Sequence, residues 1–118
     1  MDAKAVRKVR SKYGAVKTQV DGITFASKRE AARYVELKAL EKAGHISDLR
    51  LQPSYELVPA IFLDGKKQRP VRYLADFRYV DHLGETIVED VKGHKTREYQ
   101  LKRRLMKFLL GIEVKETK

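Results

Sequence analysis

Two acidic residues and a lysine follow a pattern that could support chemistry in the C-terminal half of this sequence. Asp90 and Lys92 lie two positions apart within Val88–Gly93, and Asp76 precedes them within Leu74–Phe77. Residues two apart in a strand point to the same face, so Asp90 and Lys92 share one face. If Asp76 faces the same way on its own strand, two carboxylates and an ammonium converge at one edge of a sheet. Such a site suits a hard divalent cation and an activated water.

The charge of the chain indicates what such a site would act on. The 118 residues include 26 Lys and Arg against 16 Asp and Glu, which gives a formal net charge of +10. An excess of this size favours polyanionic partners through counterion release, and nucleic acid is the leading candidate. A phosphodiester is therefore the natural substrate. The alternative is a basic surface that serves only solubility.

Length and composition narrow the class of protein further. The length predicts one domain. The absence of cysteine excludes disulfides, thiolate zinc sites and cysteine nucleophiles. No apolar run reaches membrane-spanning length and the N-terminus lacks a signal-peptide core, so we expect a cytoplasmic protein without a membrane partner. Residues 1–16 are basic without apolar periodicity and predict a flexible arm or a frayed terminus, ahead of a domain over residues 17–118.

Local signals predict the first part of that domain. Asp21-Gly22 between apolar residues predicts a small hairpin. Ser27 is a candidate helix cap, Glu30 can reach back to it, and Gly44 ends the helix. The apolar face expected for this helix comprises Ala31, Val35, Ala39 and Ala43.

Alternating apolar residues then predict strands over 49–57 and 71–80, with another over 87–92. Pro53 indicates an edge or an irregularity. Between them, residues 60–63 and the following Asp-Gly predict a further strand and turn. Consecutive antiparallel strands are expected here.

A second helix is predicted between a cap at Thr96 and a stop at Gly111. Its apolar stripe is expected to be core: Leu101, Leu105, Phe108 and Leu109. Residues 112–114 could form a last short strand. The order of elements predicts an α/β or α+β domain with a mixed central sheet flanked by helices.

The chemistry assigns a role to each central residue. Asp76 and Asp90 would be the ligands of Mg²⁺ or Mn²⁺, with the carbonyl of Val91 as an extra oxygen, because magnesium takes few carboxylates and several waters or phosphate oxygens. Lys92 would hold or deprotonate the attacking water and contact the scissile phosphate. The alternative is that these charges form ordinary surface ion pairs. However, an unpaired acid on a central strand is costly.

Other polar residues have two interpretations each. The position of Glu30 is explained by a capping box, yet Glu30 is equally a candidate for the metal or water network. Gln52 is expected to be an exposed strand residue and Tyr99 a packing residue. Three histidines are expected at the surface: His45, His82 and His94. Four basic residues are candidates for gripping DNA phosphates: Lys95, Arg97, Lys102 and Arg103.

This combination resembles the PD-(D/E)XK nuclease superfamily, and more narrowly its small phage and prophage endonucleases. The resemblance runs from residue 12 to 114 and rests on these segments: Lys12-Tyr13-Gly14, Val20-Asp21-Gly22-Ile23, Phe25–Ala31, Leu51-Gln52-Pro53, Ala75-Asp76-Phe77 and Glu89–Gly93. It implies a restriction-endonuclease-like fold with magnesium or manganese at Asp76 and Asp90 and with Lys92 as the catalytic lysine. Ala75 stands where the first motif has its proline.

The resemblance implies a metal-dependent DNA endonuclease, encoded by a phage and serving replication, recombination or packaging. Nicking or branched-DNA cleavage is compatible with it, as is a homodimer that places two sites on two strands. The alternative is a non-catalytic nucleic-acid-binding accessory protein. A nuclease requires Asp76, Asp90 and Lys92 in one site, whereas a passive binder has no reason to bring them together.

Overall fold

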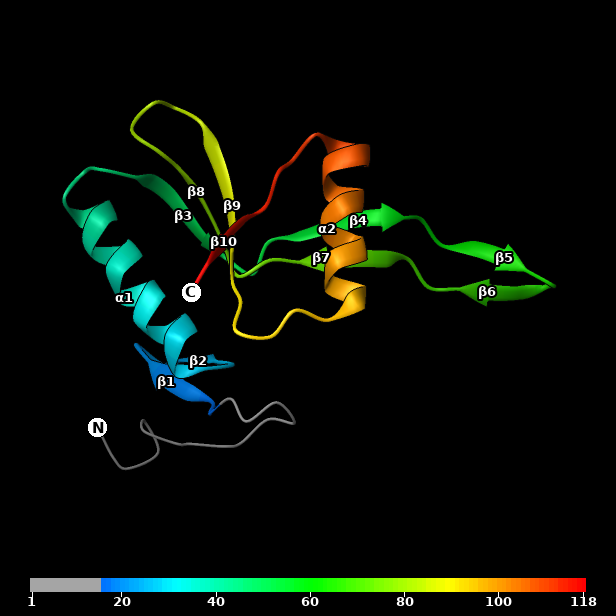
Figure 1. Ribbon diagram of the computed structural model, residues 1–118, viewed down its shortest axis with the longest axis horizontal. Coiled ribbons are helices and arrows are strands. Elements are labelled where there is room, and N and C mark those ends of the chain that lie inside the picture. The colour runs from blue at the N-terminus through cyan, green and yellow to red at the C-terminus, as the bar shows by residue number, and fades with distance from the viewer. Residues whose placement is uncertain (1–15) are drawn as a thin grey trace.

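The computed structural model describes residues 16–118, so the predicted arm lies almost wholly outside the described residues. This part of the chain is a single small α+β domain, as predicted, and neither of its helices is long and apolar enough to cross a membrane. Figure 1 shows its elements in chain order: β1 (Thr18–Val20), β2 (Ile23–Phe25), α1 (Lys28–Lys42), β3 (Ser47–Leu51), β4 (Ser54–Val58), β5 (Ile61–Leu63), β6 (Lys66–Gln68), β7 (Val71–Leu74), β8 (Phe77–Val80), β9 (Thr86–Val91), α2 (Arg97–Leu110) and β10 (Lys115–Thr117).

The centre of the fold is a four-stranded sheet in the order β10-β9-β8-β3. β8 runs antiparallel to β3 and β9, whereas β10 lies parallel to β9. This confirms the predicted mixed sheet. β8 and β9 each have a neighbour on both sides, and β9 has three consecutive buried residues: Val88, Glu89 and Asp90.

The strands predicted over 49–57 and 71–80 are each divided in two, which corrects that prediction. β3 and β8 belong to the central sheet, while β4 pairs with β7 in a ribbon that leaves it, and β5 pairs with β6 farther out (Figure 1). The break has a local cause. Gln52 adopts a left-handed φ of 49°, and its N–H donates to the carbonyl of Asp76 at 2.9 Å. The β3–β4 segment and the β7–β8 segment therefore both bend beside this hydrogen bond, at Gln52 and at Asp76.

α1 begins and ends as predicted but buries a different face. Ser27 is the cap, and its hydroxyl accepts a hydrogen bond from the N–H of Glu30 at 3.1 Å. Val35, expected in the core, is 52% exposed. The buried residues of α1 are Glu30, Ala31, Tyr34 and Leu37. Tyr34 and Leu37 offer more apolar area than the alanines, and burying the larger area is more favourable.

α2 also has the predicted ends, with Thr96 as the N-cap and Gly111 in a left-handed C-cap. Its predicted core stripe is wrong at three of four positions, because Phe108 is 84% exposed and Leu101 and Leu109 are also exposed. Leu105 is partly buried and packs against the core, as predicted. The helix instead buries Tyr99 and Met106, which lie two turns apart and pack toward β4 and β7. The last strand lies at 115–117 rather than 112–114.

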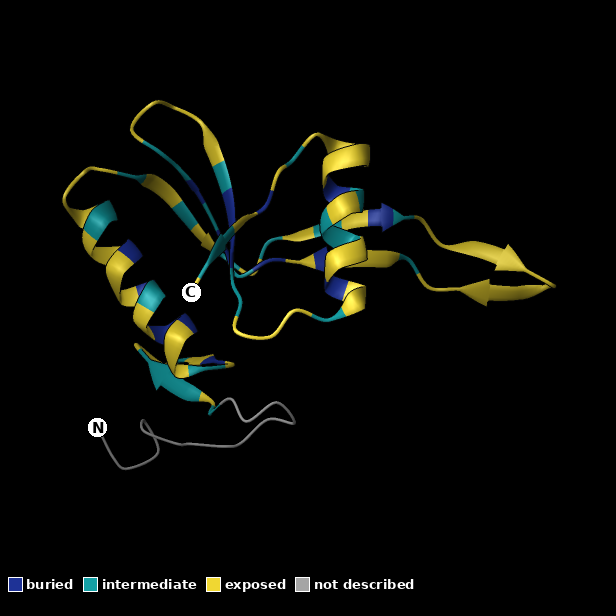
Figure 2. Ribbon diagram, in the orientation of Figure 1, coloured by how far each residue is buried: buried dark blue, intermediate teal, exposed yellow. Residues whose placement is uncertain are grey.

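Two hydrophobic clusters support the domain, one under each helix. Tyr99 and Met106 of α2 belong to one cluster, and Tyr34 and Leu37 of α1 belong to the other. Ala75 lies in the first cluster and Phe77 in the second, so the chain crosses between them at Asp76. Figure 2 shows buried segments on both sides of this junction and exposed outer faces on the helices.

Candidate metal and phosphodiester site

The side chains and backbone of Asp76 and Asp90 are interlocked at the junction of the two clusters. The N–H of Asp76 donates to Oδ1 of Asp90 at 3.1 Å. In return, the N–H of Val91 donates to Oδ2 of Asp76 at 2.7 Å. Because Asp76 lies in the bend between β7 and β8, its N–H reaches the Asp90 carboxylate on β9. The structure thus brings the two predicted acids together.

Asp90 is fully buried on the central strand, as its position between apolar residues predicted. One of its carboxylate oxygens, Oδ2, has no hydrogen-bond partner among residues 16–118. Burial raises the pKa of Asp90 to about 6, although the Lys92 ammonium and the Asp76 N–H oppose this rise. A buried carboxylate with an unused oxygen requires compensation from some other group.

Glu30 reaches the same junction from the first turn of α1. Its side chain accepts a hydrogen bond from the N–H of Ala26 at 3.3 Å, rather than from Ser27 as a simple capping box would have it. The residue is only 7% exposed. Burial, followed by the negative charge of Asp76 and a hydrogen bond with it, raises the pKa of Glu30 to about 8. Glu30 is therefore both a cap-region residue and a member of the acidic cluster.

Lys92 follows directly after β9 and points toward the acids. Its Nζ lies 4.0 Å from Oδ1 of Asp90 and 4.5 Å from the centre of the Tyr99 ring. The Tyr99 hydroxyl donates to Oε2 of Glu116 on β10 at 2.7 Å. Tyr99 is buried as predicted, but it also supports the ammonium through a cation–π contact. The sequence did not signal this contact, because it depends on how α2 docks against β9.

Arg29 is a second basic residue beside the site that the sequence did not single out. A Cβ on Gly93 would lie 3.2 Å from its guanidinium, so the side chain rests against the backbone of that glycine. The only feature of the sequence that could have indicated this role is that Arg29 directly precedes Glu30. The arginine adds positive charge next to Lys92.

The predicted ligands can be tested against what a divalent cation requires. Within residues 16–118 no preformed group of three or more His, Cys, Asp or Glu side chains could hold a metal ion. An ion here would therefore use two aspartates, with the Val91 carbonyl, waters or phosphate oxygens completing its shell, as magnesium commonly does. The unused Oδ2 of Asp90 and the proximity of Asp76 fit such an ion.

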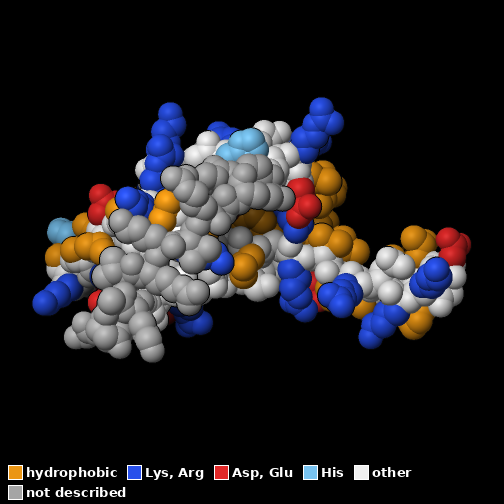
Figure 3. Space-filling view, turned by 90° about the horizontal axis from the view of Figure 1, so that it is seen from below, with side chains coloured by type: hydrophobic (Ala, Val, Ile, Leu, Met, Phe, Trp, Pro, Cys, Tyr) orange, Lys and Arg blue, Asp and Glu red, His pale blue; other side chains and the backbone are white. Residues whose placement is uncertain are grey.

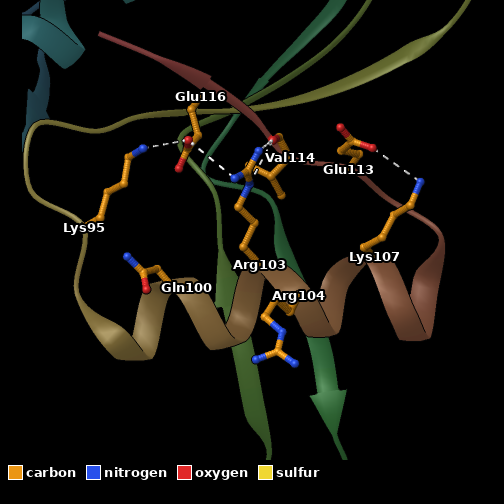
Figure 4. A pocket seen from close by; sticks show the side chains of 8 residues that line it. All are labelled: Lys95, Gln100, Arg103, Arg104, Lys107, Glu113, Val114 and Glu116. Atoms are coloured by element: carbon orange, nitrogen blue, oxygen red, sulfur yellow. Dashed lines mark hydrogen bonds and ion pairs between the residues drawn. The ribbon is translucent and has the colours of Figure 1, made fainter.

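The four predicted phosphate-gripping residues do not form one patch. Lys95 and Arg103 both turn toward Glu116, at 3.0 and 3.5 Å, as Figure 4 shows. Arg103 also donates to the carbonyl of Val114. Lys102 pairs with Glu98 at 3.1 Å, while Arg97 is exposed at the start of α2. The cavity bordered by Lys95 and Arg103 measures about 430 Å³.

The remaining candidates have the surface positions that the sequence predicted. Gln52 is exposed and contributes its backbone, not its side chain, to the bend beside Asp76. The three histidines are exposed in three separate turns: His45, His82 and His94.

Comparison with known proteins places the chain in a family. No curated protein and no solved structure matches it. Residues 10–116 match a family described as "Protein of unknown function (DUF1064)". Because this match covers nearly the whole chain, the protein belongs to the DUF1064 family.

Proposed function

We propose that the protein is a metal-dependent DNA endonuclease that hydrolyses phosphodiester bonds by attack of water. One observation carries the proposal: Glu30 from α1, Asp76 from the bend before β8, and Asp90 and Lys92 from the end of β9 meet at one junction. One oxygen of the buried Asp90 carboxylate also has no hydrogen-bond partner among residues 16–118, which favours a ligand at this point.

The proposed cofactor is Mg²⁺ or Mn²⁺, held by Asp76, Asp90 and the Val91 carbonyl. A bound divalent ion would lower the pKa of a ligated water and neutralise charge on the phosphate. Asp76 is held in place by the Val91 N–H, and Asp90 by the Asp76 N–H. These backbone bonds orient the carboxylates before any ion binds.

Lys92 supplies positive charge next to the reacting phosphate. Its position 4.0 Å from Asp90 lets the ammonium contact a phosphate oxygen or orient the attacking water. The Tyr99 ring restricts where that ammonium can go. Glu30, which forms a hydrogen bond with Asp76, can hydrogen-bond a water there or give it a proton.

DNA is the proposed substrate because the chain carries a net charge of +10. The residues at the junction are those through which the sequence resembles the small phage and prophage endonucleases of the PD-(D/E)XK superfamily. That resemblance supports a role in phage DNA replication, recombination or packaging within the host cytoplasm. It also supports nicking or cleavage of branched DNA, with a homodimer as one way to cut two strands.

The direct test is a cleavage assay on supercoiled plasmid, linear duplex, single-stranded and four-way-junction DNA, with Mg²⁺, Mn²⁺ or EDTA. We expect metal-dependent cleavage of at least one substrate by the wild-type protein and none by Asp90→Asn. A protein that binds all four substrates and cuts none with either metal would instead be the non-catalytic binding protein.

A further inference from the structure

The β5–β6 hairpin, residues 61–68 and called here the distal arm, has no counterpart in the proposed catalytic site. All six of its strand residues are exposed, and Figure 2 shows it as exposed throughout. Pro59 and Pro70 flank it, and because proline has no N–H to donate, the β4–β7 ladder cannot continue into the arm. The arm therefore projects from the body as a separate ribbon (Figure 1).

Each face of the distal arm combines a large apolar side chain with a lysine. Phe62 is paired with Lys67, and Leu63 with Lys66, and paired residues of a hairpin project to the same face. Phe62 is 73% exposed. Figure 3 shows hydrophobic and basic side chains together along the projecting arm.

The basic residues of the arm are available to a partner. Lys66 and Lys67 form no ion pair with any acidic residue in the described part of the chain, including Asp64 at the turn of the arm, and neither does Arg69 directly after the arm. An isolated two-stranded hairpin is marginally stable in water, so this exposed one would gain stability from a surface that covers it.

Charge distinguishes between two possible occupants of the arm. A second copy of this chain would bring another net charge of +10 toward the arm's lysines, which disfavours its approach. A DNA duplex brings phosphates, and its major groove, about 12 Å wide, admits a two-stranded ribbon. Within the groove the face that carries Phe62 could contact thymine methyl groups while the lysines reach the phosphates.

We propose that the distal arm enters the major groove of the duplex whose backbone is held at Asp76 and Asp90. This inference rests on the proposed function. The chain from Asp76 back to the arm's turn at Gly65 spans at most roughly 35 Å at the rise of a strand. That length corresponds to about ten base pairs of B-DNA. The arm would thus grip the duplex up to one helical turn from the cleaved bond.

The first test measures binding to a duplex of about 30 base pairs in EDTA, across a range of salt concentrations. Replacing both arm lysines in Lys66→Gln/Lys67→Gln should reduce the slope of log affinity against log salt by about 2, close to one unit for each phosphate contact. The matched control, Lys38→Gln/Lys42→Gln, removes the same charge from α1 and should keep the wild-type slope. Equal slopes for the two double variants would overturn the proposal.

The second test places a photo-cross-linking residue at Phe62, with the exposed Leu83 as the control position. Irradiation with the same duplex in EDTA should give a protein–DNA adduct from position 62 and little from position 83. A protein–protein adduct from position 62 would assign the arm to a second copy and overturn the proposal, as would no adduct under conditions where DNA is bound. Neither test uses cleavage. If both tests give the contrary result in a protein that still cuts DNA, only the proposal for the distal arm is refuted. A wild-type protein that binds no DNA would refute both proposals.

Discussion

Glu89 and Asp90 are adjacent on β9 and both fully buried, yet their surroundings differ in kind. Glu89 receives two hydrogen bonds from Arg33, at 2.6 and 2.9 Å, and a third from the Tyr79 hydroxyl at 2.7 Å. Asp90, on the other face of the strand, receives one from the Asp76 N–H and has an oxygen without a partner within residues 16–118.

The pKa values follow this difference in hydrogen bonding. Burial raises the pKa of Glu89, but the hydrogen bonds from Arg33 and Tyr79 outweigh it and leave the pKa below the usual value. Burial dominates at Asp90 and raises its pKa to about 6. One face of β9 therefore holds a carboxylate that stabilises the fold, and the other holds a carboxylate that needs a further partner. We assign the first to structure and the second to function.

The largest expected effect is on activity and comes from Asp90→Asn. The change keeps the shape of the side chain but removes the charge that would hold the cation. Cleavage with Mg²⁺ should fall to the level seen in EDTA, while thermal unfolding shows a folded protein. Asp76→Asn should lose Mg²⁺-dependent cleavage in the same way and also remain folded. Full cleavage by either variant would show that the carboxylates are not ligands.

The next effect is on stability and comes from the opposite face. Glu89→Gln leaves the Arg33 guanidinium without its carboxylate, and breaking a largely buried pair of this kind should cost about 3 kcal/mol in the free energy of unfolding. The control is Glu36→Gln, because that carboxylate contacts the same arginine from an exposed position and should cost under about 1 kcal/mol. Urea titrations that give both variants the same loss would contradict the structural role of Glu89.

Lys92→Gln separates charge at the phosphate from binding of the ion. We expect the cleavage rate at saturating Mg²⁺ to fall by about 10²–10³, the usual cost of removing one group that stabilises charge in the transition state. The affinity for the metal should change little, since the ammonium is not a ligand. If the variant cleaves DNA at the wild-type rate once the metal is saturating, Lys92 assists only in binding the ion.

The last prediction concerns the dependence of metal-free stability on pH. Burial raises the pKa of Glu30 to about 8 in the folded protein from its ordinary value of 4.5, so between these values the folded state holds a proton that the unfolded chain has lost. Stability in EDTA should therefore fall as pH rises from about 5 to 8, by up to about 1.4 kcal/mol per pH unit. Glu30→Gln should flatten this slope. An unchanged slope in that variant would contradict the raised pKa of Glu30.

The sequence predicted the features that depend on neighbouring residues. Ser27 and Thr96 cap their helices because a cap is a local hydrogen bond. Asp76, Asp90 and Lys92 were expected together because their segments read as neighbouring strands, and β8 does pair with β9. Strand periodicity thus predicted the position of Asp90, whereas Asp76 lies in the bend before β8 and Glu30 reaches the site from α1.

The features that depend on tertiary packing could not be predicted. The left-handed φ of Gln52, which divides two expected strands, has no glycine to signal it. α2 has two apolar faces, and the contact of Tyr99 and Met106 with β4 and β7 decides which is buried. Arg33 and Glu89 are 56 positions apart, and no local pattern links them.

Calorimetric titration of Mn²⁺ into the wild-type protein, Asp90→Asn and Glu89→Gln tests the assignment of the two faces most directly. At about pH 7, in two buffers of different ionisation enthalpy, we predict that wild type and folded Glu89→Gln bind the ion and release protons, because Glu30 still holds its proton at that pH. Asp90→Asn should show neither binding nor proton release. Equal binding by all three proteins would contradict the assignment of Asp90 to a cation site.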